Sequence, residues 1–476
     1  MTKPRRIYLL SPKDLSPETI AVTFAKTSRS PKPFDEIAAE LTDDRSARFH
    51  EKWVVGYGHA SVAEHAILHL ALENVSRLAI ETIEGNRLAS YTEKSTRYQQ
   101  WDEDAFYIPE EIKDHSLARE FADTCQNLFS TYHTCIPRVQ DWLRSVMPEG
   151  EDESESAYER RIQSEAVDIC RFLLPAASLA NVGVTINARA LEYAICKMLS
   201  SPLEEVRQIG EQVRKVGRLE TPTLIKYAAC NDYLVQTREK FRLRSDQIEL
   251  YREDDGFNLL TFDRDGENEV LAAILFRFAG KKNYKSCFEY VNRLPENEKV
   301  ALVQDLMAHR GQFDQPLREF EYVQMTFEII MDQGAYFEFK RHRMMTQTVQ
   351  PLTALLGFTV PKGITAAGCE DDYLSAMRQV AKLYEKLRDW DRDIASYIVP
   401  NGFNRRVLFT MNLREAFHFC RLRAAKNAHF SIRRVAQRIC ETVQSVYPHL
   451  ASFMDVPSDE TWQDIEKTYY SSIETR

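Results

Sequence analysis

Glycine is scarce in this chain, and the loops that cradle nucleotide phosphates with glycine are absent. The 476 residues include 16 glycines, and the sequence contains neither a Gly-x-x-x-x-Gly-Lys-Ser/Thr loop nor a Gly-x-Gly-x-x-Gly turn. Both motifs need glycine so that backbone N–H groups can approach a phosphate closely. A P-loop or Rossmann nucleotide site is therefore not expected, and any bound nucleotide must be held by side chains.

Disulfides, membrane spans and an excess of positive charge are also missing. The nine cysteines include no Cys-x-x-Cys pair, and their odd number argues against a disulfide framework. No apolar run is long enough to cross a membrane, and the run near the start is too short for a secretory signal. The net charge of −9 excludes a general nucleic-acid binder. We expect a reduced, cytoplasmic protein in which local arginines hold any anionic substrate.

The size and composition indicate a globular protein with two domains. A chain of 476 residues is too long for one typical hydrophobic core, so two domains are the default expectation. The hydrophobic content of 44% and the charged content of 28% are ordinary for globular proteins.

One stretch of sequence occurs twice, and each copy lacks what the other keeps. The first copy, Gly85–Tyr98, reads GNRLASYTEKSTRY, and the second, Arg341–Pro351, reads RHRMMTQTVQP. The first lacks the leading basic pair but ends in Ser-x-Arg, whereas the second has Arg-His-Arg but ends in proline. This pattern is expected when a gene is duplicated and fused, and when one active site is then built from both halves.

A second matched block supports the duplication. Half one has a Leu-Pro segment at 171–175 followed by Asn187-Ala-Arg, and half two has a similar segment ending at Pro400 followed by Asn412-Leu-Arg. The spacing from proline to asparagine is the same in both halves. We predict two tandem halves, 1–235 and 236–476, that meet near residues 230–250.

The apolar patterns favour an α+β fold in each half, with helices dominating and a small antiparallel sheet. The stretches 191–216 and 415–446 are rich in helix formers, and 323–329 alternates as a half-buried strand does. The short apolar runs 6–10, 20–24 and 270–276 fit either strands or buried helix. The acidic segment 149–156 suits a solvated loop or helix start, and the basic segment 237–244 suits a helix or a linker.

Arginines dominate the residues able to carry chemistry. Arginine offers a planar fork of donors and keeps its charge, which suits phosphate and other planar anions. Seven arginines lie in or beside the repeated motifs: Arg97, Arg171, Arg341, Arg343, Arg414, Arg421 and Arg423. Asn412 and Arg423 share one helical face, and Arg414, His418 and Arg421 form a second polar stripe. The alternative is an amphipathic helix whose arginines extend into solvent.

Two smaller clusters have both a functional and a structural interpretation. Ser95-Thr96-Arg97 offers hydroxyls and a guanidinium to one phosphate, although serine and threonine are also common helix caps. His65, His69 and Glu73 lie at i, i+4 and i+8, so one helical face could present a metal site. A pair of structural histidines explains the second cluster better than a metal site does, and we assign no metal.

These motifs resemble the flavin-dependent thymidylate synthases. The family signature is Arg-His-Arg, then Ser, then Ser-x-Arg-Tyr, preceded by Gly-His-x-Ser/Thr-x-x-Glu-His and followed by Arg-x-x-Leu-Pro and Asn-x-Arg. Half one matches at 58–65, at 87–98, at 171–175 and at 187–189, and half two matches at 341–343, 400, 412–414 and 423. Several motifs therefore recur in the same order twice, over most of the chain.

The resemblance implies a reaction, cofactors and an assembly. It implies FAD-dependent reductive methylation of dUMP to dTMP, with methylenetetrahydrofolate as the carbon donor and NADPH as the reductant. The family forms homotetramers with FAD where subunits meet, so a fused chain is expected to form a homodimer that acts as a pseudo-tetramer. No nucleic-acid or membrane partner is implied.

By position, the resemblance also assigns roles to residues. The residues implied for FAD are His59, Ser61, Arg341, His342, Arg343, Asn412, Arg414 and His418. Those implied for dUMP are Glu93, Ser95, Thr96, Arg97 and Arg171. Arg423 is implied at the pyrimidine, where it favours the ionised base, and Ser95 is implied beside the base, so these two are the expected catalytic residues.

Each half departs from the family pattern at different places. Half one has Gly85-Asn86 in place of Arg-His, and Met198 in place of the pyrimidine arginine. Half two has Pro351, Thr353 and Ser396 in place of the serine and of two nucleotide-binding arginines. We therefore expect one working site that draws on both halves. The alternatives are the same fold acting on another pyrimidine nucleotide by methyl or hydroxymethyl transfer, a decayed nucleotide-binding paralogue, and a metal-dependent helical enzyme.

Overall fold

A computed structural model describes residues 6–27, 30–41, 43–51, 60–249, 256–311 and 313–474. Within these residues the chain divides into two compact units. Unit 1 comprises residues 1–95, 105–119 and 177–249, and unit 2 comprises residues 96–104, 120–176 and 250–476. The units thus differ from the predicted halves, because two segments of half one cluster with half two. The boundary near residue 235 remains a prediction of where the two tandem copies meet.

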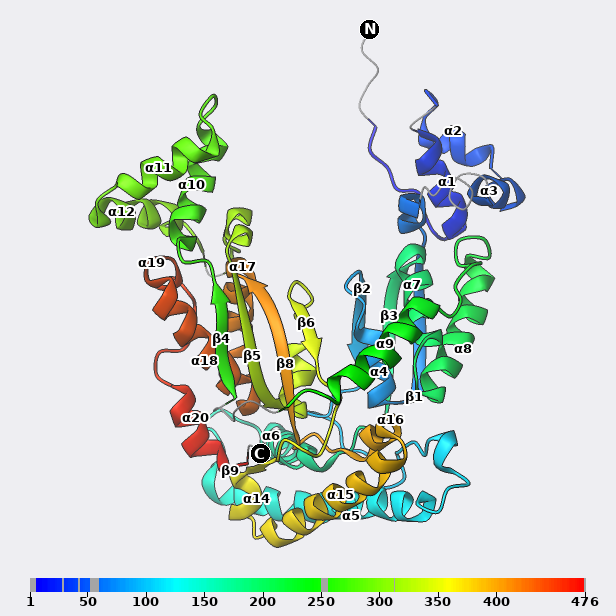
Figure 1. The fold of residues 1–476 in the computed structure, drawn as a ribbon, viewed down its shortest axis with the longest axis vertical. Helices are drawn as coiled ribbons and strands as arrows, with labels where there is room; N and C mark the ends of the chain where they lie inside the picture. Colours follow the sequence, from blue (N-terminus) through cyan, green and yellow to red (C-terminus); the bar gives the residue numbers. More distant parts are fainter. Residues whose placement is uncertain are drawn as a thin grey trace. The chain divides into compact units, whose positions relative to one another are not determined.

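Unit 1 is built on a three-stranded antiparallel sheet in the order β1-β3-β2 (Figure 1). Its strands are β1 (Ile67–Ser76), β2 (Ala89–Glu93) and β3 (Leu179–Asn187). Ile67 pairs with Asn187, and Ser90 pairs with Thr185. The register of β1 shifts between Leu72 and Val75, where Asn74 adopts a positive φ of 55°. Asparagine tolerates this left-handed conformation better than most residues, so the bulge falls at a suitable position.

Helices lie around the unit 1 sheet, and polar side chains cap the starts of several of them. The side chain of Ser76 accepts a hydrogen bond from the N–H of Ala79, and that of Asn187 accepts one from Ala190, so both residues act as N-caps. The helices are α1 (Pro17–Thr27), α2 (Phe34–Ala39), α3 (Asp43–Phe49), η2 (Ala60–His65), α4 (Arg77–Glu84), η3 (Glu110–Ile112), α7 (Ala188–Leu199), α8 (Glu204–Glu220) and α9 (Asp232–Ser245).

Unit 2 contains a four-stranded antiparallel sheet in the order β4-β5-β8-β6. Its strands are β4 (Phe257–Phe262), β5 (Gln324–Asp332), β6 (Thr346–Val349) and β8 (Asn404–Asn412). Gln324 pairs with Asn412, and Thr346 pairs with Thr410. These pairs occupy the same places relative to the helix cap as the matched pairs of unit 1. A two-stranded sheet of β7 (Thr359–Pro361) and β9 (Tyr470–Ile473) completes the strands described in this unit.

The core of this sheet follows from the alternation of its strands. Alternate residues of β5 and β8, such as Phe327 and Phe409, are buried against helices α17 and α18. The two rings stack at 5.4 Å. Helices on this sheet and around it are α10 (Gly266–Phe278), α11 (Tyr284–Arg293), α12 (Glu296–Met307), η5 (Arg318–Tyr322), α13 (Gln333–Phe339), α17 (Leu413–Arg423), α18 (Phe430–Val446), α19 (Pro448–Ala451) and α20 (Trp462–Tyr469).

Two long helices from different halves lie antiparallel in unit 2 (Figure 1). Lys386 binds Glu120 at 2.7 Å, and Asn127 donates to Gln379 at 2.8 Å, so residue numbers rise along one helix as they fall along the other. The helices of this region are α5 (Ala118–Val146), α6 (Glu155–Cys170), η4 (Arg171–Leu173), α14 (Lys362–Ala366), α15 (Glu370–Trp390), α16 (Arg392–Ala395) and η6 (Ser396–Ile398).

The two Leu-Pro segments found in the sequence pair with each other. Ala176 N–H donates to the carbonyl of Val399 at 3.0 Å, and Asn401 N–H donates to the carbonyl of Leu174 at 3.0 Å. Between these bonds, Pro175 faces Pro400 in an antiparallel bridge. The donor of each hydrogen bond occupies the same position in its segment as the donor of the other, and so does the acceptor. The contact therefore relates the two repeats by a local two-fold symmetry.

The helix-rich α+β prediction is confirmed, and several local predictions change. The runs 20–24 and 270–276 lie in helices α1 and α10, whereas 6–10 lies in no helix or strand. Short apolar runs do not distinguish strand from buried helix, which explains the ambiguity. The basic segment 237–244 belongs to helix α9, and the acidic segment 149–156 leads into α6.

Candidate functional site

A chain of alternating charges runs through unit 2 and joins arginines of both halves. Arg97 Nε lies 2.9 Å from Asp168 Oδ2, and Asp168 Oδ1 lies 3.4 Å from Arg171 Nε. Arg171 Nη2 lies 3.6 Å from Glu338 Oε1, and Glu338 Oε2 lies 3.0 Å from Arg423 Nη1. We call these five residues the charge chain. Its first three members come from half one and its last two from half two.

Burial distinguishes the middle of the charge chain from its ends. The side chain of Arg171 is 3% exposed, whereas those of Arg97 and Arg423 are 21% and 17% exposed. A buried guanidinium is costly unless carboxylates pair with it, and Asp168 and Glu338 supply two. The buried ion pairs of Arg171 therefore hold the charge chain together, and the partly exposed arginines at its two ends retain access to a ligand.

His342 fixes the orientation of Arg423. Arg423 Nε donates to His342 Nε2 at 2.9 Å, and His342 Nδ1 lies 2.9 Å from Glu415 Oε1. A guanidinium can only donate, so Nε2 accepts, and the ring proton must lie on Nδ1 and point to Glu415. Burial lowers the pKa of His342, against the opposing effect of Glu415. The imidazole is thus a neutral acceptor that holds the guanidinium in one plane.

Arg423 lies in a strongly positive environment. Burial lowers its pKa, Glu338 raises it, and the charges of Arg341 and Arg97 lower it further. Its Nη2 has no hydrogen-bond partner among the residues that the structure describes. Arg341 is exposed and likewise has no ion-pair partner within the described part of the chain. Arg423 Nη2 and the guanidinium of Arg341 therefore have donors available to a ligand, and Arg341 is near enough to lower the pKa of Arg423.

The opposite end of the charge chain rests on the loop between α17 and α18. Arg97 Nη1 and Nη2 lie 3.4 and 3.3 Å from the carbonyl oxygen of Asn427. His429, at the end of this loop, lies 3.7 Å from Asp168 and is fully buried against Phe430. Burial lowers the pKa of His429, and the charges of Arg171 and Arg97 lower it further, so a neutral ring backs the carboxylate.

Helix caps explain why these side chains converge. Asp332 caps α13 by accepting from the N–H of Ala335 at 2.8 Å, and α13 carries Glu338 in its last turn. Asn412 caps α17 by accepting from the N–H of Glu415 at 2.8 Å, and α17 ends at Arg423. Both helices start at the ends of paired strands, β5 and β8, so the sheet sets their positions.

The comparisons with known proteins show the family to which the chain belongs. The family model described as "Thymidylate synthase complementing protein" matches residues 10–223 and again residues 258–449. The chain belongs to this family. Because the model matches twice, the chain carries two copies of the family's domain.

The chain is similar to two kinds of protein. A UPF0159 protein of Chlamydia muridarum is 29% identical over 87% of this chain and 82% of its own length. A UPF0159 protein of Thermoplasma acidophilum is 28% identical over 87% of this chain and 89% of its own length. A flavin-dependent thymidylate synthase of Clostridium tetani is 27% identical over 45% of this chain and 82% of its own length. The second kind of relative therefore matches about half of the chain.

Several residues assigned by the family resemblance lie in or beside the charge chain. Arg97, Arg171, His342 and Arg423 are linked by the contacts above, and Arg341 lies close enough to affect the pKa of Arg423. The His418 ring lies 5.6 Å from the His342 ring, and Thr96 is buried. Arg343 follows His342 and is half-buried. The sequence thus identified most cations of the cluster, and their roles stay predictions.

Other assigned residues have structural partners of their own. Asn412 is the cap of α17, just as Asn187 is the cap of α7, so the repeated asparagine has the same structural role in both halves. Arg414 donates to the carbonyl of Pro316 and pairs with Glu321, both at 2.8 Å. These contacts show that the Asn-x-Arg repeat stabilises the start of a helix, whatever else it does.

The remaining assigned residues belong to unit 1 or lie outside the described ranges. Glu93 and Ser95 fall in unit 1, and Glu93 faces Arg77 at 3.4 Å with both side chains buried. Ser61 is exposed in η2. His59 lies outside the described residues. Their roles in binding FAD or dUMP stay predictions.

Sequence reasoning missed the carboxylates of the family site. Asp168 and Glu338 each contact an assigned arginine, Glu415 contacts the assigned His342, and none of the three was singled out. One signal was available, since Asp168 and Glu338 each precede a motif arginine, Arg171 and Arg341, by three residues. A buried arginine requires a buried acid, and this rule points from a motif arginine to the carboxylates near it in the sequence.

The helical metal face considered for His65, His69 and Glu73 is wrong. His69 and Glu73 lie in strand β1, where residues four apart do not share a helical face, and His69 Nδ1 binds Thr185 at 2.9 Å instead. Among the described residues, no group of three histidine, cysteine or acidic side chains could hold a metal ion. In the same part of the chain, every helix is too short or too polar to span a bilayer.

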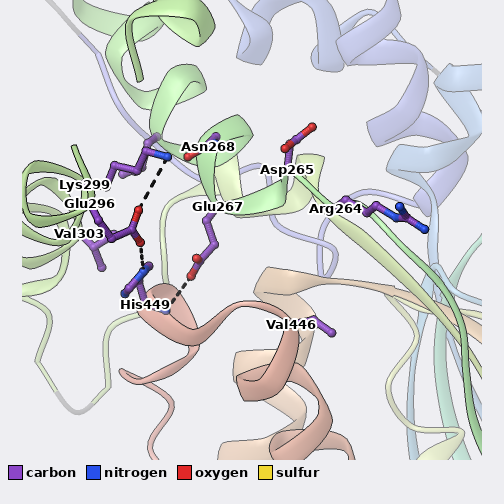
Figure 2. A pocket seen from close by; sticks show the side chains of 10 residues that line it. Arg264, Asp265, Glu267, Asn268, Glu296, Lys299, Val303, Val446 and His449 are labelled. Atoms are coloured by element: carbon purple, nitrogen blue, oxygen red, sulfur yellow. Dashed lines mark hydrogen bonds and ion pairs between the residues drawn. The ribbon is translucent and has the colours of Figure 1, made fainter. Parts of the chain in front are cut away.

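A separate polar cavity of about 140 Å³ in unit 2 has its charges balanced (Figure 2). Glu296 lies between His449 and Lys299, and Glu267 accepts hydrogen bonds from the N–H groups of His449 and Leu450. Glu18 of unit 1 likewise accepts from the N–H groups of Thr223 and Leu224. This repeated carboxylate anchors a turn after each long helix, so the cavity belongs to the framework.

Proposed function

We propose that this chain is a flavin-dependent enzyme that methylates dUMP to dTMP, using methylenetetrahydrofolate and NADPH. The observation that carries the proposal is the charge chain, in which Arg97 and Arg171 of the first copy meet Arg423 of the second. Each copy lacks a part that the other supplies, and the half-length relatives are named flavin-dependent thymidylate synthases.

The proposed division of labour follows from exposure and charge. Arg97 is partly exposed at one end of the charge chain, where a guanidinium fork suits a nucleotide phosphate. Arg423 is partly exposed at the other end, where its Nη2 would donate to a uracil oxygen that gains negative charge. His342 and Glu415 hold that guanidinium in place, so little reorganisation is needed during the reaction.

The residues present also fit a flavin adenine dinucleotide. Arg341 and Arg343 flank His342 in the sequence, and the His418 ring lies 5.6 Å from the His342 ring. Guanidiniums suit a pyrophosphate in a chain with few glycines. When bound, the flavin supplies a hydride to the pyrimidine. The neutral His342 ring suits this neighbourhood because it adds no further positive charge.

The direct test uses the purified full chain reconstituted with FAD. We expect a flavin absorbance spectrum, oxidation of NADPH that depends on dUMP, and dTMP in the product mixture by mass spectrometry. A protein that binds dUMP yet retains no flavin and forms no product would contradict the proposal.

A second candidate is the same chemistry on a cytosine nucleotide. Glu338 Oε2 lies 3.0 Å from Arg423 Nη1, so an acceptor lies beside the proposed position of the base. A carboxylate accepts from the amino group of cytosine, whereas uracil has an oxygen at that place. Parallel reactions with dUMP, UMP and dCMP decide between them, because methyl and hydroxymethyl products differ in mass. If every nucleotide binds but none reacts, the chain is a decayed paralogue.

We also propose that two chains associate as a homodimer, since the family resemblance implies four domain copies per assembly. Light scattering coupled to size-exclusion chromatography measures this directly. A mass of one chain across the working concentration range would refute the dimer, and it would leave the test of the reaction unaffected.

A further inference from the structure

Unit 1 contains a cavity of about 390 Å³ that plays no part in the proposed reaction. It lies at the loop between α7 and α8, beneath helix α9, whose basic sequence the proposed function leaves unexplained. The lining residues that matter are Ser200, Arg207, Cys230, Arg238 and Arg242. The volume is in the range of small-molecule pockets.

The arginines of this cavity are held by backbone carbonyls. Arg207 Nη1 donates to the carbonyls of Ser201 at 2.8 Å and of Pro202 at 2.6 Å. Arg238 Nη1 donates to the carbonyl of Ser200 at 2.6 Å. Arg238 and Arg242 lie one helical turn apart on α9, so both present their side chains to the same cavity. The guanidiniums of Arg207 and Arg238 are thus positioned before any ligand arrives.

Positive charge exceeds negative charge at this cavity. Three guanidiniums line it against one carboxylate, that of the exposed Glu239. Arg207 also pairs with Glu204 outside the lining, at 2.5 Å. Arg238 has no carboxylate partner among the residues that the structure describes. An anion entering the cavity would therefore meet the charge of Arg238, which no carboxylate offsets by a direct contact in the described part of the chain.

The equivalent place in unit 2 lacks this excess. There Arg433 matches Arg207, because its Nη1 donates to the carbonyl of Lys426 in the matched loop at 2.9 Å. Its Nη2 lies 3.3 Å from Glu460, and its guanidinium lies 5.0 Å from the ring of Tyr469. The segment that covers this loop in unit 2 thus supplies an acid and an aromatic ring, whereas α9 supplies two more arginines.

We propose that the cavity under α9 binds a small phosphate-bearing anion, such as a phosphate ester or a short polyphosphate, through Arg207, Arg238 and Arg242. Planar guanidinium forks match phosphate oxygens, and the carbonyls already hold one edge of two of these forks. The site is separate from the charge chain and stands whether or not the proposed reaction is correct.

Cys230 offers a direct readout of occupancy. It lines the cavity and is the one exposed cysteine of the nine, of which seven are buried and Cys196 is intermediate. We expect saturating pyrophosphate to slow the alkylation of Cys230 by N-ethylmaleimide at least about tenfold, because a bound anion blocks access and disfavours the thiolate. N-ethylmaleimide is uncharged, so salt does not alter its approach. Peptide mass spectrometry confirms the alkylated residue.

Matched variants identify the ligand site. The double variant Arg238→Gln with Arg242→Gln should raise the pyrophosphate concentration for half-protection at least about tenfold. Lys240→Gln removes a charge from an exposed position of the same helix outside the lining, so protection should stay as in the parent chain. Inorganic phosphate, a nucleoside monophosphate and tripolyphosphate then distinguish esters from polyphosphates.

Two results would overturn the proposal. One is equal protection by sodium chloride at the same ionic strength, and the other is undiminished protection in the double variant. If the double variant does not fold by circular dichroism, Arg242→Gln alone is used, with calorimetric titration of the parent chain by pyrophosphate. No binding heat and no protection in the parent chain would also refute the site.

Discussion

The two copies of the domain share a framework but differ in what they place on it. Asn187 and Asn412 cap matched helices, and Ser90 and Thr346 pair with matched threonines. Counting from these anchors, half one has apolar or neutral residues where half two has charges. The matched pairs are Thr82 and Glu338, Asn86 and His342, Ala190 and Glu415, and Met198 and Arg423.

The consequence is visible at the half-one counterpart of the Arg423 site. Met198 and Asn86 line a cavity of only about 20 Å³ whose other walls are largely aliphatic, such as Leu70 and Val184. Asn86 donates to the carbonyl of Ile83 at 2.8 Å. Half one therefore fills this position with packed, mostly apolar side chains, whereas half two keeps charged side chains whose burial costs stability. A functional role explains the charged residues of half two, since stability alone favours the apolar residues of half one.

The largest expected effect on activity comes from replacing Arg423 of half two with methionine, the residue at the matched position of half one. Arg423→Met removes a donor held in place for charge that develops on the base, so dUMP-dependent NADPH oxidation should fall about 100-fold or more. The free energy of unfolding should change little, because Arg423 is only partly buried and its removal leaves Glu338 paired with Arg171.

Met198→Leu is the matched control for this variant. It conserves volume in the apolar copy, so activity should stay within about twofold and stability should fall by less than about 1.5 kcal/mol. Equal loss of activity in both variants would contradict the difference between the copies.

The next effect is on stability. Glu338→Ala leaves the buried Arg171 with one carboxylate instead of two, and breaking a buried pair of this kind costs about 3 kcal/mol. Denaturant unfolding measures the loss, with Thr82→Ala as the matched change in half one. Since Thr82 is only half-buried and pairs with no arginine in the described contacts, its variant should lose less than about 1 kcal/mol.

A third effect depends on pH. The pKa of His342 is lowered in the folded protein, so it stays neutral where the unfolded chain, with a pKa near 6.5, takes up a proton. Its contribution to stability is complete above about pH 6.5 and is lost as the pH falls toward the folded pKa. His342→Asn, which installs the half-one residue, should reduce the slope of stability against pH by up to about 1.4 kcal/mol per unit below pH 6.5.

His429 serves as an internal reference for this titration. Its pKa is also lowered, so part of the slope must remain in the His342→Asn variant. An unchanged slope in that variant would mean that His342 is protonated in the folded protein, and that the assigned ring tautomer is wrong.

The smallest effect tests the shared framework. Asn187→Ala and Asn412→Ala each remove one helix cap, and each should cost about 1 kcal/mol in the free energy of unfolding. Equal losses would show that the repeated asparagine is structural in both copies. A much larger effect of Asn412→Ala on flavin retention would give it the additional role that the family resemblance implies.

The sequence predicted the repeat and most of the cations, and its failures share one physical reason. Motif spacing led to Arg97, Arg171, His342 and Arg423, because each lies at a fixed place in a repeated pattern. Asp168 and Glu338 escaped notice because their importance comes from contacts with arginines of the other copy, and a local pattern does not reveal such partners. The strand at His69 was mistaken for helix because its apolar residues fit more than one period.

The compact units do not follow the order of the two copies along the chain, and the reason is related. Residues 120–176 continue half one in sequence, yet they cluster with half two because α5 lies against α15 and the two Leu-Pro segments pair. No shift in amino-acid composition marks the positions where the chain passes from one unit to the other.

The bridge between Pro175 and Pro400 has an evolutionary consequence. In an assembly of identical subunits, a mutation on one side of such a contact appears on the other side as well, so both sides change together. Here the two sides are encoded separately within one gene. Each can therefore lose a group that its neighbour retains, and the fused gene can explore asymmetric pairings that are closed to a single-copy ancestor.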